Sequence, residues 1–250
     1  MSSLYVNTTN EIQKVFLRKK NIVLLAIAAS IPVDAAFSFG FLQNRLGIFA
    51  VNAASFPLFV LDLLTSVILP LFIFSVAADL FAGEAGENTL KITLTRPVTR
   101  LKVFLSKIAA TGAFIITCLG TAFVISIAAG AVLEGRAPGP AGWWESLLAY
   151  SAAVVPMLVL AVLAAFLNQL FKSGSSALMA SVLVYLLAKA LPFMSPALGR
   201  LSPVAYTGWH SLLLGTTVGA EVIWNALLLM AAYLLIFFGG GYYLFDKKDF

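Results

Sequence analysis

The sequence has very little charge. Only 11% of its 250 residues are Asp, Glu, Lys or Arg, whereas a soluble domain carries about 25%. Hydrophobic residues make up 61% of the chain, and the mean hydropathy is +0.98. This shortage of charge excludes an ordinary water-soluble domain, because most of the surface must face lipid. In lipid every backbone polar group needs an internal partner, which only helices and closed barrels provide.

The apolar runs decide between these two structures. Barrel strands alternate apolar and polar residues over about 10 positions. The runs in this chain are continuous and much longer. The sequence therefore predicts an all-α integral membrane protein.

Reactive and metal-binding residues are nearly absent. Cys118 is the only cysteine and lies in an apolar run, which excludes an intrachain disulfide and a thiolate metal cluster. The sequence contains no Gly-x-x-x-x-Gly-Lys-[Ser/Thr] phosphate loop and no His-Glu-x-x-His zinc motif, so we expect no ATP site of the usual kind in this chain. His210 is the only histidine, and both a structural role at the membrane interface and a proton-relay role are open.

Six apolar runs each have the roughly 20 residues that a 30 Å hydrocarbon core demands. They cover about residues 21–40, 56–80, 108–133, 144–171, 176–194 and 222–245, within a single transmembrane domain of residues 1–250. Three consecutive glycines, Gly239 to Gly241, in the last run would permit close helix packing or a bend. Prolines and glycines interrupt residues 191–219, which predicts short outer or re-entrant helices there.

Residues 8–20 predict a short basic amphipathic helix that lies on the membrane surface. Thr8 and Glu11 have the spacing of a capping box, with Thr8 as the N-cap. Ile12 and Val15 would then share an apolar face.

Lys and Arg residues are distributed unevenly between the two sets of span ends. On the side opposite the termini, only Arg45, Arg136 and Arg200 flank the spans. Most of the 16 Lys and Arg residues flank the span ends on the side of the termini. The positive-inside rule therefore predicts cytoplasmic N- and C-termini in a multi-pass protein of the plasma membrane. In this setting the net charge of +5 indicates membrane orientation rather than a nucleic-acid partner.

Residues 79–107 form a large polar connection between the second and third runs. Glu84 and Glu87 are three positions apart and would point the same way on a helix. Pro97 suits an early helical position. An apolar face with helical spacing follows at Leu101, Phe104, Leu105 and Ile108. The pattern predicts an amphipathic cytoplasmic helix leading into the third span, and an ordinary solvated loop is the alternative.

This connection resembles the loop after the second span of type-2 ATP-binding-cassette exporter permeases. The residues that carry the resemblance are Asp79, Glu84, Glu87, Thr89-Leu90, Leu94, Pro97, Arg100 and Lys107. Such loops commonly read Asp, then Glu, then Gly-Thr-Leu, then Leu-x-x-Pro-x-Ser/Thr-Arg, then Lys. Asn88 departs from this pattern, because glycine is usual there. The six-span plan, the basic N-terminal helix and the broken segment before the last span extend the resemblance to the whole chain.

The resemblance implies a transport subunit without chemistry of its own. Two permease chains, identical or different, would pair and bind two ATPase subunits on the cytoplasmic side, where ATP and Mg²⁺ are expected. The chain itself would hold no cofactor. An amphipathic or apolar substrate (a peptide, lipid or drug) would be exported by alternating access. The residues implied in ATPase coupling are Asp79, Glu84, Glu87, Thr89, Arg96, Pro97, Arg100 and Lys107.

Two charged residues, Asp62 and Lys189, lie inside predicted spans, in the outer half of the membrane. Charges at that depth are costly unless they are paired or hydrated. The two residues would therefore either pair with each other or line the substrate path.

Two other function classes compete with the exporter. An ion-coupled secondary transporter would favour buried carboxylates near the midplane and inverted repeats. Asp62 is the only fair candidate for such a carboxylate, and no repeat is evident. A membrane enzyme acting on lipids would need clustered Asp, His or Arg at one interface, but the carboxylates here are scattered.

Overall fold

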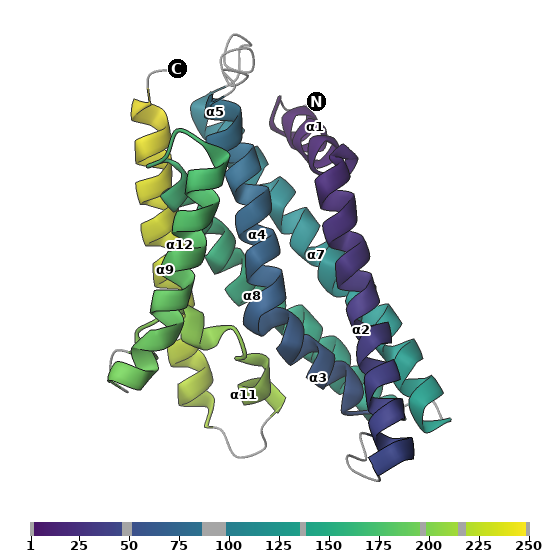
Figure 1. The fold of residues 1–250 in the computed structure, drawn as a ribbon. Coiled ribbons are helices and arrows are strands. Elements are labelled where there is room, and N and C mark those ends of the chain that lie inside the picture. Colours follow the sequence, from purple (N-terminus) through teal and green to yellow (C-terminus); the bar gives the residue numbers. More distant parts are fainter. Residues whose placement is uncertain are drawn as a thin grey trace.

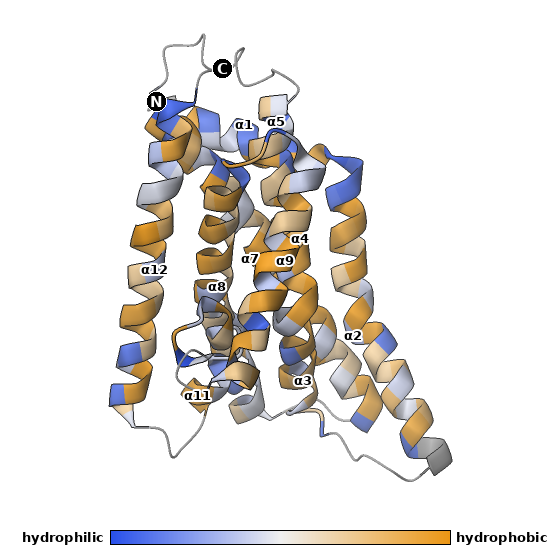
Figure 2. Cartoon of the chain, turned by 60° about the vertical axis from the view of Figure 1, so that its left-hand side comes forward, coloured by the Kyte–Doolittle hydropathy of each residue, from blue (hydrophilic) through white to orange (hydrophobic). Residues whose placement is uncertain are grey.

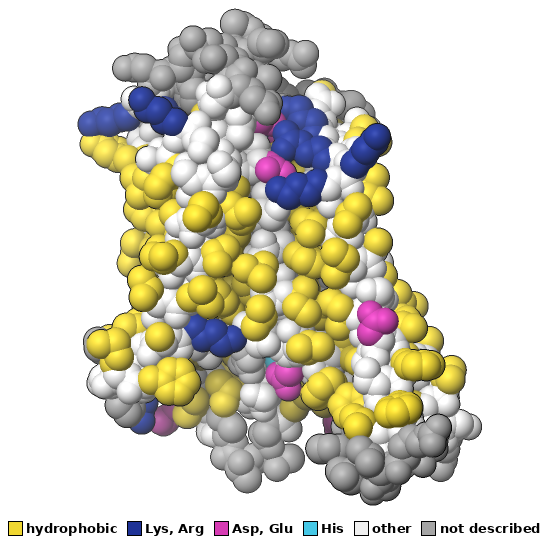
Figure 3. Space-filling model, in the orientation of Figure 1, with side chains coloured by type: hydrophobic (Ala, Val, Ile, Leu, Met, Phe, Trp, Pro, Cys, Tyr) yellow, Lys and Arg dark blue, Asp and Glu magenta, His cyan; other side chains and the backbone are white. Residues whose placement is uncertain are grey.

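The chain forms a bundle of helices. The computed structural model describes residues 3–46, 52–86, 99–135, 139–195, 199–214 and 219–248, and every regular element in these ranges is a helix. Both chain ends lie at the same end of the bundle (Figure 1). Most Lys and Arg side chains on the visible face gather there (Figure 3), so we call it the basic end and the other the opposite end. The predicted all-α class is confirmed.

Six helices in these ranges are long and apolar enough to cross a membrane. They are α2 (Lys19–Leu46), a second span running from Phe56 to Gly86, α7 (Arg100–Glu134), α8 (Pro140–Asn168), α9 (Gly174–Met194) and α12 (Ala220–Lys247). Apolar residues occupy most of their length (Figure 2). The prediction of six spans is confirmed. The helix α7 begins at Arg100 rather than at 108, because the amphipathic turns before the predicted span continue directly into it.

The second span is one helix with two wide turns. It comprises α3 (Phe56–Leu63), the π-helical turn η1 (Leu64–Ile68), α4 (Leu69–Ala78), the π-helical turn η2 (Asp79–Gly83) and α5 (Glu84–Gly86). Pro70 lies at the start of α4 and has no N–H to offer the carbonyl of Ser66, four residues earlier. The wide turn η1 contains that carbonyl, so the sequence itself accounts for the irregularity.

The N-terminal helix α1 (Ser3–Leu17) packs on α7. It begins at Ser3 rather than at the predicted Thr8, so the capping-box assignment was wrong. The hydroxyl of Thr9 donates to the oxygen of Tyr5, within a helix already formed. The buried side of α1 includes Val15, which lies in the core. Part of the predicted apolar face therefore covers α7.

The second span and α8 form the centre of the bundle, and their apolar windows are the most buried of the six. The helices α2, α9 and α12 lie at the periphery and are mostly exposed. α12 approaches α7 and α8 closely at Gly241, where a Cβ atom would lie 3.1 Å from Phe104 and 3.3 Å from the Cα atom of Phe166. Of the two roles open for the glycine run, the structure shows close packing.

At the opposite end, residues 199–214 include the 3₁₀ turn η3 (Pro203–Tyr206) and the short helix α11 (His210–Leu214). Both pack on α8. The prediction of short helices in residues 191–219 holds for this described part, whereas residues 191–194 belong to α9.

Candidate functional site

A network of charged side chains joins α1, α5 and α7 at the basic end. At its centre, the Nζ atom of Lys107 lies 2.5 Å from a carboxylate oxygen of Glu84 and 3.2 Å from one of Glu11. The three side chains are 0%, 5% and 1% exposed. Buried charges of this kind persist only when they are paired, because their desolvation is costly. Lys107 therefore ties the N-terminal helix and the end of the second span to α7.

Two further cations surround this centre. Lys14 lies 2.8 Å from Glu11 and 3.5 Å from Glu84, and Arg18 lies 3.8 Å from Glu84. Each buried carboxylate therefore faces more than one positive charge. Lys14 and Arg18 are partly exposed, so they connect the buried centre to the surface.

The predicted residue Asp79 belongs to the same network. It is the first residue of the π-helical turn η2, and its carboxylate lies 3.6 Å from Arg18 and 3.2 Å from Lys20. The junction of α1 and α2, where Arg18 and Lys20 lie, is thereby linked to the second span.

The network shifts the pKa of two α1 side chains. Burial alone would raise the pKa of Glu11, but the positive charges of Lys107 and Lys14 outweigh it and lower that pKa below its ordinary 4.5. Burial would lower the pKa of Lys14, but its contacts with Glu11 and Glu84 outweigh this effect and raise the pKa. Both shifts favour the charged forms, as expected for ion pairs that stabilise the fold.

A second set of contacts holds the start of α7. Arg100 donates to the backbone oxygens of Asp246 and Lys248 at the end of α12. Lys248 in turn donates to the backbone oxygens of Gln169 and Phe171, between α8 and α9. Cationic side chains commonly satisfy the last carbonyls of a helix in this way. Arg100 therefore fixes the start of α7 to the C-terminal helix.

These contacts place the predicted coupling residues in two groups. Asp79, Glu84, Arg100 and Lys107 lie at the basic end, where their charged groups contact other parts of the chain. Glu87, Thr89, Arg96 and Pro97 lie outside the described residues. Their predicted contact with an ATPase stays a prediction.

Sequence reasoning missed the roles of Glu11, Lys14 and Arg18 in this network. Glu11 was interpreted as part of a capping box, and the two cations as orientation signals. One signal was available, because Glu11 is four positions before Val15 and so shares the predicted apolar face. A carboxylate on that face needs a buried cation as its partner.

Asp62 and Lys189 do not form an ion pair with each other in the described structure. Asp62 lies 3.1 Å from the Nε2 atom of His210, on α11. Lys189 instead donates to the backbone oxygen of Ser66, which also accepts a bond from Tyr185. Asp62 and Lys189 therefore each contact a group other than the opposite charge, His210 and the oxygen of Ser66 respectively.

The acceptor of Lys189 lies four residues before Pro70, and the carbonyls four residues before Pro156 and Pro192 are bound in a similar way. The span α2 contains a further proline, Pro32, which is not part of this set. Proline cannot donate to such a carbonyl, so an ordinary helical hydrogen bond is missing there. In all three places a side chain from another segment donates to the oxygen. The pairs are Pro70 with Ser66, bound by Tyr185 and Lys189; Pro156 with Ala152, bound by Trp209; and Pro192 with Ala188, bound by Ser202. Two of these bonds dock residues 199–214 on α8 and α9.

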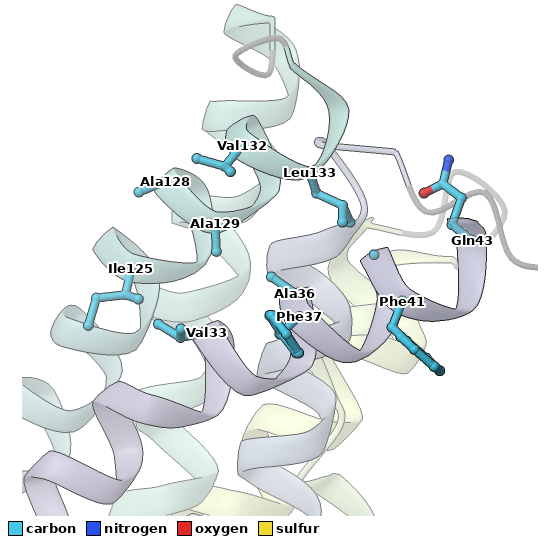
Figure 4. A pocket seen from close by; sticks show the side chains of 11 residues that line it. Val33, Ala36, Phe37, Phe41, Gln43, Ile125, Ala128, Ala129, Val132 and Leu133 are labelled. Carbon is cyan, nitrogen blue, oxygen red and sulfur yellow. The ribbon is translucent and has the colours of Figure 1, made fainter. Parts of the chain in front are cut away.

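An apolar groove of about 850 Å³ opens between α2 and α7 near the opposite end (Figure 4). Its lining contains no charged side chain and shares no residue with the Lys107 network or with the contacts of Arg100. The lining residues are Val33, Ala36, Phe37, Gly40, Phe41, Gln43, Ile125, Ala128, Ala129, Val132 and Leu133. Within the part of the chain that the structure describes, no three His, Cys, Asp or Glu side chains are grouped to hold a metal ion.

A family model described as ABC-2 family transporter protein matches residues 9–189. The match runs from α1 through most of α9, and includes every residue of the Lys107 network. The chain belongs to the ABC-2 transporter family. The predicted resemblance is thereby confirmed, and this ABC-2 protein is a membrane transport subunit rather than an enzyme. No curated protein matches its sequence.

Proposed function

We propose that this ABC-2 permease is the membrane-spanning subunit of an ATP-driven exporter whose motor is a separate ATPase. It pairs with a second permease chain, identical or different, and binds ATPase subunits at its basic end. ATP and Mg²⁺ bind to those subunits, and this chain holds no cofactor. Closure of the ATPases rocks the helices between inward-open and outward-open states. An amphipathic or apolar peptide, lipid or drug thereby leaves the cytoplasm.

The observation that carries this proposal is that the described residues on either side of positions 87–98 are held by contacts with other parts of the chain. Before this segment, Glu84 is tied to Lys107 by a buried ion pair. After it, Arg100 is tied to the end of α12. A force applied to this segment would therefore reach α1, α7 and α12 together. Packed helices move as rigid bodies, so such a connection suits the transfer of motion from a motor.

The anchoring divides the predicted coupling residues into two roles. Glu84 and Lys107 are buried within the chain, so they act by positioning the ends of the segment. Asp79 and Arg100 support those ends. Glu87, Thr89, Arg96 and Pro97 lie between the anchors and make the contact with the ATPase.

The charge distribution supports a cytoplasmic position for the basic end. Lys14, Arg18, Lys20 and Lys107 all lie there, and Lys and Arg near short loops favour the cytoplasmic side. Both termini are then cytoplasmic, and residues 199–214 face the outside of the plasma membrane.

The position of Asp62 supports a substrate path between α3 and α9. Its side chain is 63% exposed, although it belongs to a membrane-spanning helix. Lys189 reaches the same helix one turn further on, at Ser66. Because a charge exposed to hydrocarbon is costly, this surface faces hydrated substrate or the second permease.

The test is purification of the tagged permease from native membranes in mild detergent. We expect a nucleotide-hydrolysing subunit to copurify, and Arg96→Glu to reduce its recovery at least several-fold. Arg200→Glu is the matched control, because Arg200 is an exposed arginine at the opposite end. It should leave the recovery unchanged.

Two results would overturn the proposal. One is full recovery of an active ATPase with the Arg96→Glu variant. The other is transport by the purified chain under a proton or sodium gradient with no nucleotide-hydrolysing subunit present, which would favour the secondary transporter.

A further inference from the structure

The apolar groove between α2 and α7 has walls of regular construction (Figure 4). Its lining runs from Val33 to Phe41 on α2 and from Ile125 to Leu133 on α7. On both helices the lining residues recur at positions i, i+3, i+4, i+7 and i+8, which is the spacing of a single helix face. Two continuous helix faces therefore enclose the groove.

Small side chains in the middle of each face keep the groove open. They are Ala36 and Gly40 on α2, and Ala128 and Ala129 on α7. A Cβ atom at Gly40 would lie 3.5 Å from a methyl carbon of Leu133, so the two helices stay in contact beside the groove. The space of about 850 Å³ is thus bounded by packed helices.

The chemistry of the lining is apolar. Gln43 is its one polar side chain, and none of the lining residues is charged. Ligand sites in proteins commonly have volumes of about 300–1,000 Å³ and apolar walls with a few polar groups. A ligand of this groove must therefore carry a large apolar part.

Asp34 supplies a negative charge at the edge of the groove. It follows Val33 directly and is three positions before Phe37, and residues three apart are neighbours on a helix surface. Its side chain is exposed. The hydroxyl of Ser38 donates to its backbone oxygen, and none of the ion pairs among the described residues includes its carboxylate.

Asp34 lies within the membrane wherever α2 crosses it completely. The helix has 28 residues and is about 42 Å long, whereas a hydrocarbon core is about 30 Å thick. Asp34 is about 22 Å from the start of α2 and about 18 Å from its end, so every such crossing includes it. A carboxylate at that depth is costly unless it is paired or hydrated.

The candidate occupants satisfy these features to different degrees. A lipid acyl chain would fill the groove but leave Asp34 without a partner. A second copy of the chain would have to bring a cation to this depth. The described residues carry one cation in the outer half of a span, Lys189, and it already binds Ser66. A molecule with an apolar body and a positive group satisfies both features, because opposite charges attract strongly at low dielectric.

We propose that the groove between α2 and α7 binds a cationic amphipathic molecule, with its apolar body between the two helix faces and its positive charge at Asp34. Binding does not depend on the motor. That the bound cation is the exported cargo rests on the function proposed above.

The test measures binding of tetraphenylphosphonium to the full chain in nanodiscs of phosphatidylcholine. Tetraphenylborate has the same shape and the opposite charge, and empty nanodiscs give the background of partition into lipid. We expect saturable binding of the phosphonium ion above this background, and no saturable binding of the borate ion.

Two variants remove the two features of the site separately. Asp34→Asn keeps the size of the side chain and removes its charge, so it should weaken phosphonium binding about tenfold or more. Ala128→Phe fills the groove and should abolish binding. The matched controls are Glu221→Gln and Ala232→Phe, which change an exposed carboxylate and an exposed alanine of α12. Both controls should bind as the parent does.

Three results would overturn the proposal. One is the lack of saturable phosphonium binding by the parent, and another is unchanged affinity in Asp34→Asn. The third is equal binding of the two ions, which would mean that the groove accepts any apolar molecule, such as a lipid chain.

Light scattering tests the remaining occupant. If Ala128→Phe converts a dimer into monomers, a second copy fills the groove, and the proposal is wrong. Recovery of the ATPase with the permease is a separate measurement. Failure of the binding site would therefore leave the exporter proposal standing, and failure of copurification would leave the binding site standing.

Discussion

Trp209 replaces the hydrogen-bond donor that Pro156 lacks. Pro156 leaves the backbone oxygen of Ala152 without its helical donor, and the indole N–H of Trp209 donates to that oxygen at 2.8 Å. A helix break inside a span thus provides the docking point for a segment from elsewhere in the chain. This relationship can be tested because either side of it can be removed separately.

Trp209→Phe should destabilise the parent protein by about 1–3 kcal/mol beyond its loss of volume, because the oxygen of Ala152 loses its donor. In a Pro156→Ala background, residue 156 supplies a backbone N–H to that oxygen, so the same change should cost about 1 kcal/mol less. Thermal unfolding of the four proteins in detergent measures the difference. The change in packing is common to both backgrounds and cancels.

Trp144→Phe serves as the control for this cycle, because Trp144 is 61% exposed. It should have the same small effect in both backgrounds. If Trp209→Phe proves equally costly with and without Pro156, the hydrogen bond contributes nothing measurable.

Lys107→Met should destabilise the protein by about 3–5 kcal/mol, because it leaves Glu11 and Glu84 buried without their shared cation. Neutralising all three residues, as Glu11→Gln, Glu84→Gln and Lys107→Met, should recover most of that loss. The thermal unfolding midpoint in detergent checks both statements, with Lys19→Met as an exposed-lysine control. A triple variant less stable than Lys107→Met alone would refute the electrostatic explanation.

Stability should also depend on the protonation of Glu11. Its pKa in the folded protein lies below the ordinary 4.5, so its ion pairs contribute fully above that pH. Their contribution is lost as the pH falls through the lowered pKa, because the protonated carboxyl no longer attracts Lys107. The unfolding midpoint of the wild type should therefore fall more steeply below 4.5 than that of Glu11→Gln. The exposed Glu145→Gln variant should follow the wild type, and identical curves for Glu11→Gln and wild type would contradict this assignment.

The glycine run of α12 offers a matched pair of substitutions. A Cβ atom at Gly241 would lie 3.3 Å from the backbone of Phe166, whereas one at Gly239 would meet nothing within 4 Å. Gly241→Ala should therefore push α12 from α8 and destabilise the protein by about 1–3 kcal/mol. Gly239→Ala should stabilise it by about 0.5–1 kcal/mol through its better helix propensity. Equal unfolding midpoints for the two variants would show that α12 does not depend on this contact.

The membrane fold could be predicted because its signals are long and redundant. An apolar run of about 20 residues has one structural solution in lipid, and six such runs define the bundle. The start of α1 was less predictable, because Thr8 and Glu11 suit a capping box as well as a helix interior. In the structure Glu11 lies in the helix interior and pairs with Lys107, a tertiary contact that sequence spacing does not reveal.

The candidate sites could be predicted only in part. Lys107 and Glu84 were singled out by resemblance, but their burial follows from the packing of α1, which local patterns do not reveal. For Asp62 and Lys189 the sequence left mutual pairing and a place on the substrate path open, and neither alternative included the backbone acceptor of Lys189. Pro70 was the available signal, since a proline in a span exposes the carbonyl four residues before it.

The burial of Glu11 against Lys107 also sets an order of events during synthesis. Glu11 leaves the ribosome long before Lys107 does, so its final partner does not yet exist when the first helices reach the bilayer. Until the third span has been inserted, Glu11 has only Lys14 of its two ion-pair partners available. The helix α1 thus reaches its final packing on α7 only after the third span is present.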